Sequence, residues 1–372
     1  MKKIFKTAAA VSVAAAVACS AGCGGNTKWS FKSGDNELTN GNWIFETYIG
    51  TMNAVSKISE GNSEKNIQNI DFEKEEIEGS PAKDWIYMQA KIDCKRQLTL
   101  DNLMKKYGAT VDQSEADSMK QMYVNYFYSG SKELYEKLGV SEDSFVTAYV
   151  LPNLKSSALF NKLYGKGGEK AVSDEEMNKY FTENYVTYYT LTYNLKTSND
   201  SGESMDISDE QKDIAETNFR KYVKMLNEQG KTTQEVSDQY KVDFSVETAP
   251  ATNETTLASD MEDEDLKKEV EAAEVKKAKT VTIHDTLYLI YKGDIDEKVA
   301  DLKYPEDIKE DDTTSISRLS VARNMKTEEY EDFLDKEIDK LDYTRNDDCI
   351  AKYSVMRTVG IIKEEEKKNA SK

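Results

Sequence analysis

The side chains with the widest range of chemistry in this 372-residue chain are four cysteine thiols and one imidazole. Cys23 is the most distinctive of them, because it directly follows the small residues Ala21 and Gly22. It ends a stretch that begins with basic residues and continues with an apolar run over residues 7–18. We interpret Cys23 as a site of covalent modification, with Cys19 as the alternative.

The residues before Cys23 have the parts of a secretory signal peptide. Lys2, Lys3 and Lys6 give a positive start. The apolar run is shorter than the roughly 20 residues that a bilayer-spanning helix needs. Small residues then precede the cleavage point. We therefore expect residues 1–22 to be removed from the mature protein.

The segment that ends at Cys23 resembles the lipobox of bacterial lipoproteins, although Ser20 stands where that family usually has an aliphatic residue. The resemblance implies a diacylglyceryl thioether on Cys23, which then becomes the mature N-terminus. Ordinary cleavage and release is the alternative. One acyl chain anchors a protein only marginally, so stable anchoring takes two or more. We expect residues 23–39 to form a lipid-anchored tether on the outer face of the bacterial cytoplasmic membrane.

The charge of the chain limits its partners. It has 50 Lys and Arg against 69 Asp and Glu, a net charge of −19. Residues 1–22 contain three lysines and no acid, so the mature chain carries −22. Nucleic-acid backbones attract Lys and Arg, which excludes nucleic acid as a partner. An anionic membrane surface also repels this chain, so the lipid is its expected membrane contact.

The remaining thiols and the imidazole predict no active site. The sequence leaves open whether Cys94 and Cys349 form a disulfide. Without a Cys/His cluster there is no nitrogen-and-sulfur metal site. His284 and Asp285 could suggest a catalytic pair, but no nucleophile accompanies them, and we interpret His284 as a histidine at a strand edge. We expect no catalytic residue, no cofactor and no metal.

One acidic segment has the approximate spacing of a calcium-binding loop. Its residues are Asp260, Glu262 and Glu264, but the central glycine that such a loop requires is missing. We interpret them as acids at the start of a helix over residues 261–275. Negative charge is favourable there because of the helix dipole.

Residues 40–184 have a mainly helical pattern. Ser141 is placed as a helix N-cap, and Ser173 forms a capping box with Glu176. Gly108 is placed as a helix end. We expect this segment to be an N-terminal helical domain.

The composition changes at Tyr185. Residues 185–195 and 280–291 are rich in Tyr, Thr and β-branched residues, which predicts two strands. Between them the pattern predicts two helices capped at Ser208 and Thr232, a brief strand at 242–246, and the acidic helix.

The predicted fold class is therefore α+β. An α+β domain at 185–298 is inserted into a helical body formed by the N- and C-terminal segments. A helix within 313–357 returns to this body. Residues 358–372 are expected to be a solvated charged tail.

Three segments carry a resemblance to a known family: LGVSEDSF (138–145), VSDEEMNKYFTEN (172–184) and the stretch 333–353. They resemble the SurA/PrsA-type extracytoplasmic foldases, which have parvulin-like domains. The resemblance implies a helical chaperone body, a parvulin-like domain at 185–298, and unfolded or newly secreted polypeptides as partners.

The chemistry of an active parvulin is missing from the matching positions. The family has a histidine in its first strand, where this chain has Tyr189-Thr190-Leu191. The family has a glycine-rich loop, whereas this chain has no glycine between Gly230 and Gly293. Prolyl isomerisation must lower a barrier of about 18–20 kcal/mol. We see no residues arranged to do so and expect a degenerate parvulin-like domain.

Tyrosines offer the remaining candidates for a binding surface. Core packing is the default interpretation, but tyrosine also provides apolar area with a polar tip, which suits varied unfolded chains. The aromatic residues concerned in the helical segment are Tyr123, Tyr126, Phe127, Tyr128, Tyr149 and Tyr164.

These observations favour a membrane-anchored extracytoplasmic chaperone or foldase-like lipoprotein without prolyl isomerase activity. One alternative is an active peptidyl-prolyl isomerase. The other is a surface lipoprotein that binds a cell-wall component or a small solute.

The anchor is tested by mass spectrometry of the native protein. We expect a mature N-terminus at Cys23 that carries the added mass of a diacylglyceryl group. An unmodified, soluble species would contradict the lipoprotein interpretation.

Overall fold

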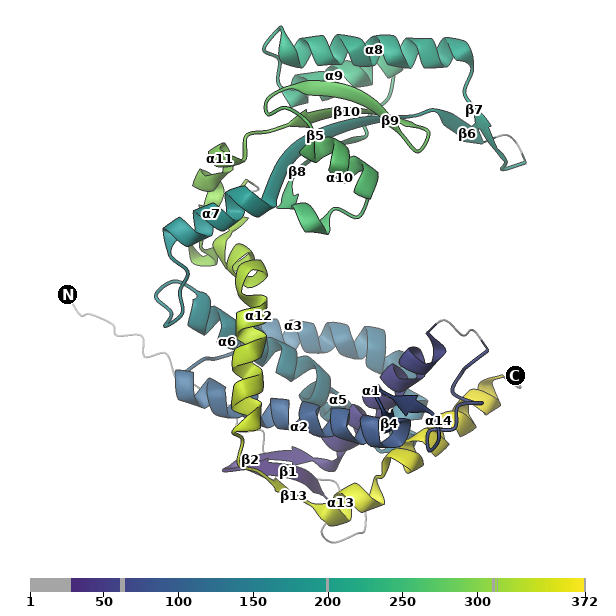
Figure 1. Ribbon diagram of the computed structural model, residues 1–372, viewed down its shortest axis with the longest axis vertical. Helices are drawn as coiled ribbons and strands as arrows, with labels where there is room; N and C mark the ends of the chain where they lie inside the picture. The colour runs from purple at the N-terminus through teal and green to yellow at the C-terminus, as the bar shows by residue number, and fades with distance from the viewer. Residues whose placement is uncertain (1–27, 61–63, 199–200, 310–311, 313, 371–372) are drawn as a thin grey trace, which may run out of the picture. The chain divides into compact units, whose positions relative to one another are not determined.

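The computed structural model describes residues 28–60, 64–198, 201–309, 312 and 314–370. Cys23, Cys19 and the signal peptide lie outside the described residues. The fold is α+β, as predicted from the sequence (Figure 1). The chain divides into two compact units. Residues up to Ser156 join with those from Leu334 onward, and Ser157–Phe333 form the second unit.

The chain passes from the first unit to the second within helix α6 (Leu151–Tyr164) and returns within α12 (Arg318–Asp339). The sequence pattern groups residues 157–184 with the helical body, but they cluster with the second unit. The reason is packing. Phe160 stacks on Tyr164 with ring centroids 4.5 Å apart and meets Tyr330 of α12 edge-on at 5.3 Å.

The first unit is mostly helical. Its elements are β1 (Trp29–Ser33), β2 (Asn36–Thr39), α1 (Asn40–Ser59), β3 (Glu76–Ile77), β4 (Ser80–Pro81), α2 (Ala82–Tyr107), α3 (Gln113–Tyr123), η1 (Val124–Tyr128), η2 (Ser129–Ser131), α4 (Lys132–Leu138), α5 (Glu142–Phe145), η3 (Val146–Val150), β13 (Thr344–Arg345), α13 (Asp347–Lys352) and α14 (Val355–Asn369).

The tether predicted for residues 23–39 is wrong from residue 28 onward. Strands β1 and β2 form a hairpin there, and β1 also pairs antiparallel with β13 from the C-terminal segment. Phe31 is fully buried and Leu38 nearly so. These apolar side chains alternate with polar ones, so one face of the hairpin covers the core.

Helix α1 lies at the centre of this unit. Thr39 and Asn42 form a capping box at its start. Trp43, Ile44 and Phe45 are almost completely buried, and the helix packs against α2, α5 and α14. Gly50 of α1 allows the close approach of α2, because a Cβ there would lie 3.3 Å from Ile86.

The charged tail predicted at residues 358–372 is instead largely the helix α14. Val355, Val359 and Ile362 lie on one side of this helix and are buried in the core of the first unit. They are spaced as on one face of an α-helix, while the Lys and Glu residues take the other face. The high charge of the segment thus belongs to the solvent side of an amphipathic helix.

The second unit contains a four-stranded antiparallel sheet in the order β8-β5-β10-β9. Its elements are α7 (Asp174–Asn184), β5 (Tyr185–Asn194), β6 (Lys196–Ser198), β7 (Ser204–Asp206), α8 (Asp209–Asn227), α9 (Thr233–Phe244), β8 (Ala251–Leu257), η4 (Ala258–Asp260), α10 (Glu264–Glu271), β9 (Ala278–Ile283), β10 (Thr286–Lys292), α11 (Ile295–Lys298), η5 (Val299–Asp301), β11 (Leu302–Lys303), η6 (Pro305–Asp307) and β12 (Ile316–Ser317).

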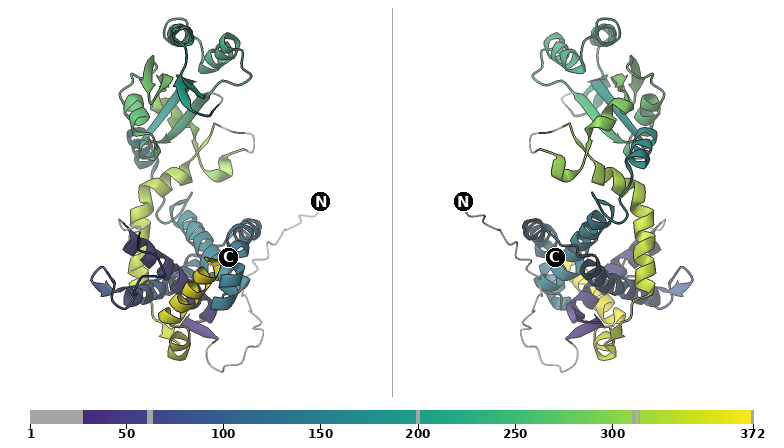
Figure 2. Two further views of the ribbon diagram at one scale, coloured as in Figure 1. Left: turned by 90° about the vertical axis from the view of Figure 1, so that its right-hand side faces the viewer. Right: turned by 90° about the vertical axis from the view of Figure 1, so that its left-hand side faces the viewer.

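Both faces of this sheet are covered (Figures 1 and 2). Helices α8 and α9 pack on one face, where Tyr189, Leu191 and Leu289 point. Helix α10 packs on the other, against Tyr188 and Ile290. Neighbouring residues of β5 and β10 thus enter opposite cores, as the two-residue period of a strand requires.

Two expectations about this unit need correction. The brief strand predicted at 242–246 is the end of α9, and the strand of that region is β8. Phe244 packs on Tyr193 of β5 with ring centroids 4.8 Å apart, and this non-local contact holds the end of the helix on the sheet. The single strand predicted at 280–291 is the hairpin β9–β10, with His284 and Asp285 at the turn.

The local helix signals are confirmed. Ser173 with Glu176, Ser208 with Gln211, and Thr232 with Glu235 all form capping boxes; their helices are α7, α8 and α9. Ser141 caps α5. Gly108 ends α2 in the left-handed conformation that glycine accommodates best.

Both cysteines of the folded body carry free thiols and are completely buried. Burial raises the pKa of Cys94 well above its usual range and that of Cys349 to about 11. Within the described residues, no helix combines the length and apolar character needed to cross a bilayer.

A buried polar chain runs through the core of the first unit. Gln97 donates from Nε2 to Glu46 Oε1 at 2.6 Å and accepts on Oε1 from Asn42 Nδ2 at 2.9 Å. Thr39 in turn donates to Asn42 at 2.7 Å. Burial, with the nearby Asp93 carboxylate, raises the pKa of Glu46 well above its usual range.

The raised pKa makes Glu46 a pH-dependent weakness of the fold. An unfolded glutamate ionises at a pKa of about 4.3, whereas folded Glu46 keeps its proton to a higher pH. The stability of the folded state is therefore fully present below about pH 4.3 and falls as pH rises toward the folded pKa.

We predict that Glu46→Gln stabilises the protein at pH 7 and has little effect at pH 4, because glutamine keeps the acceptor for Gln97 without a charge. Each kcal/mol gained raises the melting temperature by about 2–4 °C. Thermal unfolding at both pH values measures this. Glu247→Gln, on the surface, controls for the change in net charge. Equal destabilisation by Glu46→Gln at both pH values would contradict the prediction.

Candidate functional site

The candidate site is a group of aromatic and apolar side chains at the end of α3. We call Met122, Tyr123, Tyr126, Phe127 and Tyr149 the aromatic patch. The first two belong to α3, the next two to η1 and the last to η3. All five lie in the first unit.

Both η1 and η3 are π-helical turns. Ser129 donates its backbone N–H to Val124 O, and Leu151 does the same to Val146 O, each five residues back in the chain. One inserted residue rotates the next part of the helix by about 100° around its axis. π-Turns of this kind are rare and often mark functional sites.

The wide turn in η1 separates consecutive aromatic residues. Tyr128 is buried, stacks on Tyr135 with centroids 5.4 Å apart and donates to Val140 O at 3.4 Å. Tyr126 and Phe127, directly before it, are 77% and 51% exposed. The turn thus supplies one ring to the core and leaves two at the surface.

A chain of ring contacts holds the patch on the core. Tyr149 packs on the buried rings of Phe45 and Phe145 at 5.9 and 5.6 Å. On its other side it meets Tyr123 edge-on at 5.5 Å, and Tyr123 stacks on Phe127 at 5.4 Å. Each aromatic pair contributes about 0.5–1.5 kcal/mol beyond the burial of its area. The exposed Phe127 ring is therefore positioned before any ligand arrives.

The environment of the patch is uncharged at its inner edge. Burial raises the pKa of Tyr128 and of Tyr135, so both hydroxyls stay protonated and act as hydrogen-bond donors. Such a surface can bind apolar side chains through its rings and peptide groups through its hydroxyls. It offers no nucleophile and no general base.

The structure brings together most of the tyrosines singled out from sequence. Tyr123, Tyr126, Phe127 and Tyr149 form the patch, and Tyr128 lies beneath it. Tyr164 belongs to the second unit instead: it is almost fully buried and donates to Glu329 Oε1 at 3.0 Å. Met122, which is 39% exposed, belongs to the patch but is not among the sequence candidates.

The positions expected to match an isomerase site are in the sheet of the second unit. Tyr189 is 3% exposed and shares a hydrogen bond of 2.8 Å with the Ser237 hydroxyl. Leu191 and, on β10, Leu289 and Ile290 are fully buried. Side chains in these positions contact the two cores of the unit and have no access to a substrate.

His284 is at a hairpin turn rather than at the edge of a strand. Its φ is 45° and that of Asp285 is 62°, both in the left-handed region. Asp285 points to Lys196, with 3.9 Å between Oδ2 and Nζ, so it pairs with a lysine. His284 Nε2 lies 3.0 Å from Asp265 Oδ2 of α10. The acids that meet His284 are thus neighbours of those that the sequence suggested.

Two hollows of the surface have other linings. A cleft of about 220 Å³ in the first unit is lined by Trp43, Tyr87, Ile350, Val355 and Met356, among others. Small-molecule pockets usually have about 300–1,000 Å³, so this cleft has room for one side chain. A depression of about 550 Å³ runs along one face of α8 and is lined by residues of that helix alone.

No protein-family model and no curated protein sequence matches the chain. Two crystal structures align with it. The foldase protein PrsA from Streptococcus pneumoniae (strain Canada MDR_19A) has 16% identity and a TM-score of 0.31, over 73% of this chain and 93% of that one. PrsA from Bacillus subtilis has 13% identity and a TM-score of 0.26, over 79% and 93%. Similarity this low carries no argument for function.

Proposed function

We propose that this protein is a membrane-anchored extracytoplasmic chaperone of the holdase type, foldase-like in its organisation and without prolyl isomerase activity. Its clients are unfolded or newly secreted polypeptides. The observation that carries the proposal is the aromatic patch, where Tyr126 and Phe127 expose apolar rings on a rigid support.

The patch has the chemistry that an unfolded client needs. Unfolded chains expose apolar side chains together with unpaired peptide groups. Burying one large apolar side chain contributes about 1.5–3 kcal/mol, and tyrosine hydroxyls can pair with peptide groups in many geometries. Met122 adds a flexible side chain that adapts to different partners. Contacts of this kind are transient and independent of client sequence.

The charge of the mature chain supports the same function. A net charge of −22 on the chain keeps it and any bound client in solution, because like-charged complexes repel one another. Acylation of Cys23 would hold the protein on the outer face of the cytoplasmic membrane, where secreted chains emerge unfolded.

The second unit acts in this proposal as a parvulin-like arm at 185–298 that does not catalyse. An isomerase must hold a twisted peptide bond, which takes polar groups facing the substrate. At the positions that match the family's catalytic strands, the side chains are buried Tyr189, Leu191 and Leu289.

We predict that the mature chain with Cys23→Ser, which lacks the acylation site, suppresses aggregation of a reduced secreted protein in a light-scattering assay. Replacing both Tyr126 and Phe127 by Ser removes most of the suppression, because client affinity falls about tenfold or more, or about 1.4 kcal/mol. The melting temperature stays nearly unchanged, since exposed substitutions alter stability by about 0.5 kcal/mol or less.

Val242→Ser is the matched control, because Val242 is 72% exposed on α9 of the second unit and its replacement also removes an exposed apolar group. It should leave the suppression intact. No suppression by the unmodified chain at stoichiometric excess would count against the holdase proposal. One saturable small ligand with a thermal shift would favour a binding lipoprotein instead.

The absence of isomerase activity is tested separately. In a protease-coupled assay with a proline-containing peptide, we expect the rate of the mature chain to equal the uncatalysed rate, since no group among the described residues of the second unit is placed to lower the barrier. A rate clearly above background would restore the active isomerase as the better interpretation.

A further inference from the structure

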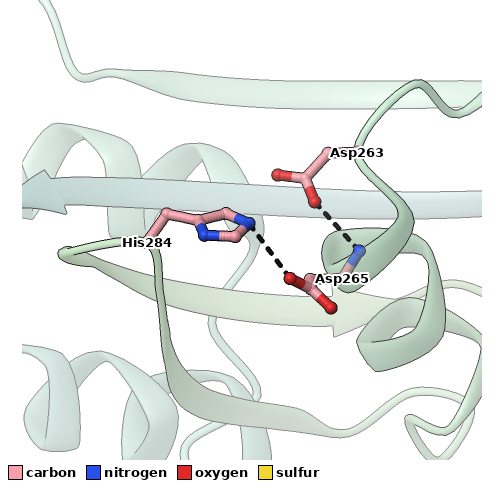
Figure 3. A group of neighbouring side chains, drawn as sticks. All are labelled: Asp263, Asp265 and His284. Atoms are coloured by element: carbon pink, nitrogen blue, oxygen red, sulfur yellow. Dashed lines mark hydrogen bonds and ion pairs between the residues drawn. The ribbon is translucent and has the colours of Figure 1, made fainter.

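Three metal-ligating side chains from two elements converge on one side of the second unit (Figure 3). Asp263 and Asp265 come from the start of α10, and His284 comes from the turn between β9 and β10. One ligand atom from each lies within 4.8 Å of the others. His284 is the single histidine of the whole chain.

We propose that Asp263, Asp265 and His284 bind one divalent transition-metal ion of the zinc class. This site is independent of the polypeptide-binding function, and its residues lie far in the sequence from the aromatic patch. Two carboxylates and one imidazole are ligands that zinc and its neighbours accept, whereas calcium and magnesium prefer oxygen alone.

The distances fit such an ion after a small closure. Ligand atoms about 2.1 Å from a tetrahedral zinc ion are about 3.4 Å apart. His284 Nε2 and Asp265 Oδ2 are already 3.0 Å apart, so an ion between them requires a slight separation. The remaining atoms of the set, within 4.8 Å, need to approach by about an ångström.

Each ligand has one free atom and one reason to stay in place. Asp263 caps α10 through Oδ1, which accepts from the backbone N–H groups of Asp265 and Leu266 at 3.0 Å each. Its second oxygen remains for a metal. The side chains of Asp265 and His284 are 63% and 71% exposed, so an ion can enter from solvent and keep water in its open positions.

The surroundings hold the two elements together and attract cations. Lys279 of β9 pairs with Glu269 of α10 at 2.6 Å, and Val270 of α10 is fully buried on the sheet. These contacts fix the distance between α10 and the hairpin. Five of the six residues at 260–265 are acidic, which raises the local concentration of divalent cations. A bound metal would staple the hairpin tip to the helix.

The test is zinc titration of the mature chain carrying Cys23→Ser and purified without a polyhistidine tag. Cys94 and Cys349 are buried and do not compete. We expect calorimetry to show saturable binding of one Zn²⁺ per chain. Because loss of even a partner of a ligand weakens metal sites about 10–100-fold, His284→Asn and Asp265→Asn should each weaken binding at least about tenfold.

The variants are chosen to keep the fold. Asparagine tolerates the left-handed conformation of position 284, and Asp263→Asn keeps a good helix cap. Asp285→Asn is the control: it removes the same charge from the same turn without removing a proposed ligand, and it should bind zinc as the unmodified chain does. Equal loss in Asp285→Asn and Asp265→Asn would reduce the site to general acidic attraction and overturn the proposal.

A second readout uses the single imidazole. Mn²⁺, a paramagnetic probe, should broaden the proton NMR signals of the His284 ring at substoichiometric concentration, and Zn²⁺ should displace it. Unchanged His284 signals, or unmodified chain and His284→Asn with the same zinc affinity, would overturn the proposal.

Discussion

The first unit depends on the closure of the C-terminal segment over the N-terminal one. Trp43 of α1 donates from its indole nitrogen to Tyr353 O at 2.8 Å, and Asn346 donates to Trp29 O at 3.0 Å. Strand β13 completes the edge of the small sheet, and α14 covers α1. A tryptophan so deeply buried requires both the apolar contacts and a partner for its N–H. Without residues 334–370, α1 would expose its core face, and the support of the aromatic patch would be lost with it.

Local signals in the sequence predict much of this fold. The capping boxes at Ser173, Ser208 and Thr232 are predicted correctly, because a cap is decided by residues three positions apart. Strand β5 is predicted to within one residue, since its tyrosines and threonines alternate between two buried faces. These elements need no information from distant parts of the chain.

The errors share a physical cause, which is that a non-local contact overrides a local pattern. The end of α9 has the composition of a strand, but Phe244 packs on Tyr193 of the sheet as well as on Tyr240 of its own helix. The turn at His284 and Asp285 has neither glycine nor asparagine, so the hairpin resembles one long strand. For α14 the helical spacing of Val355, Val359 and Ile362 is present, but the charge of the segment conceals it.

The candidate site is predictable only in part. The concentration of tyrosines is visible in the sequence, whereas the π-turn that sends Tyr128 inward and Phe127 outward is not. Likewise, residue types alone cannot bring His284 to Asp265, since that depends on how α10 lies on the sheet.

The two-segment construction of the first unit also has a consequence for the order in which the protein matures. A chain that crosses a membrane from its N-terminus delivers α1 and α2 long before β13, with residues 157–333 in between. The hydrogen bond between Trp29 and Asn346 joins positions 317 residues apart. Closing so long a loop is entropically unfavourable and slow. The inserted unit, whose strands are neighbours in sequence, can therefore fold first, and the surface that receives other immature chains is completed last.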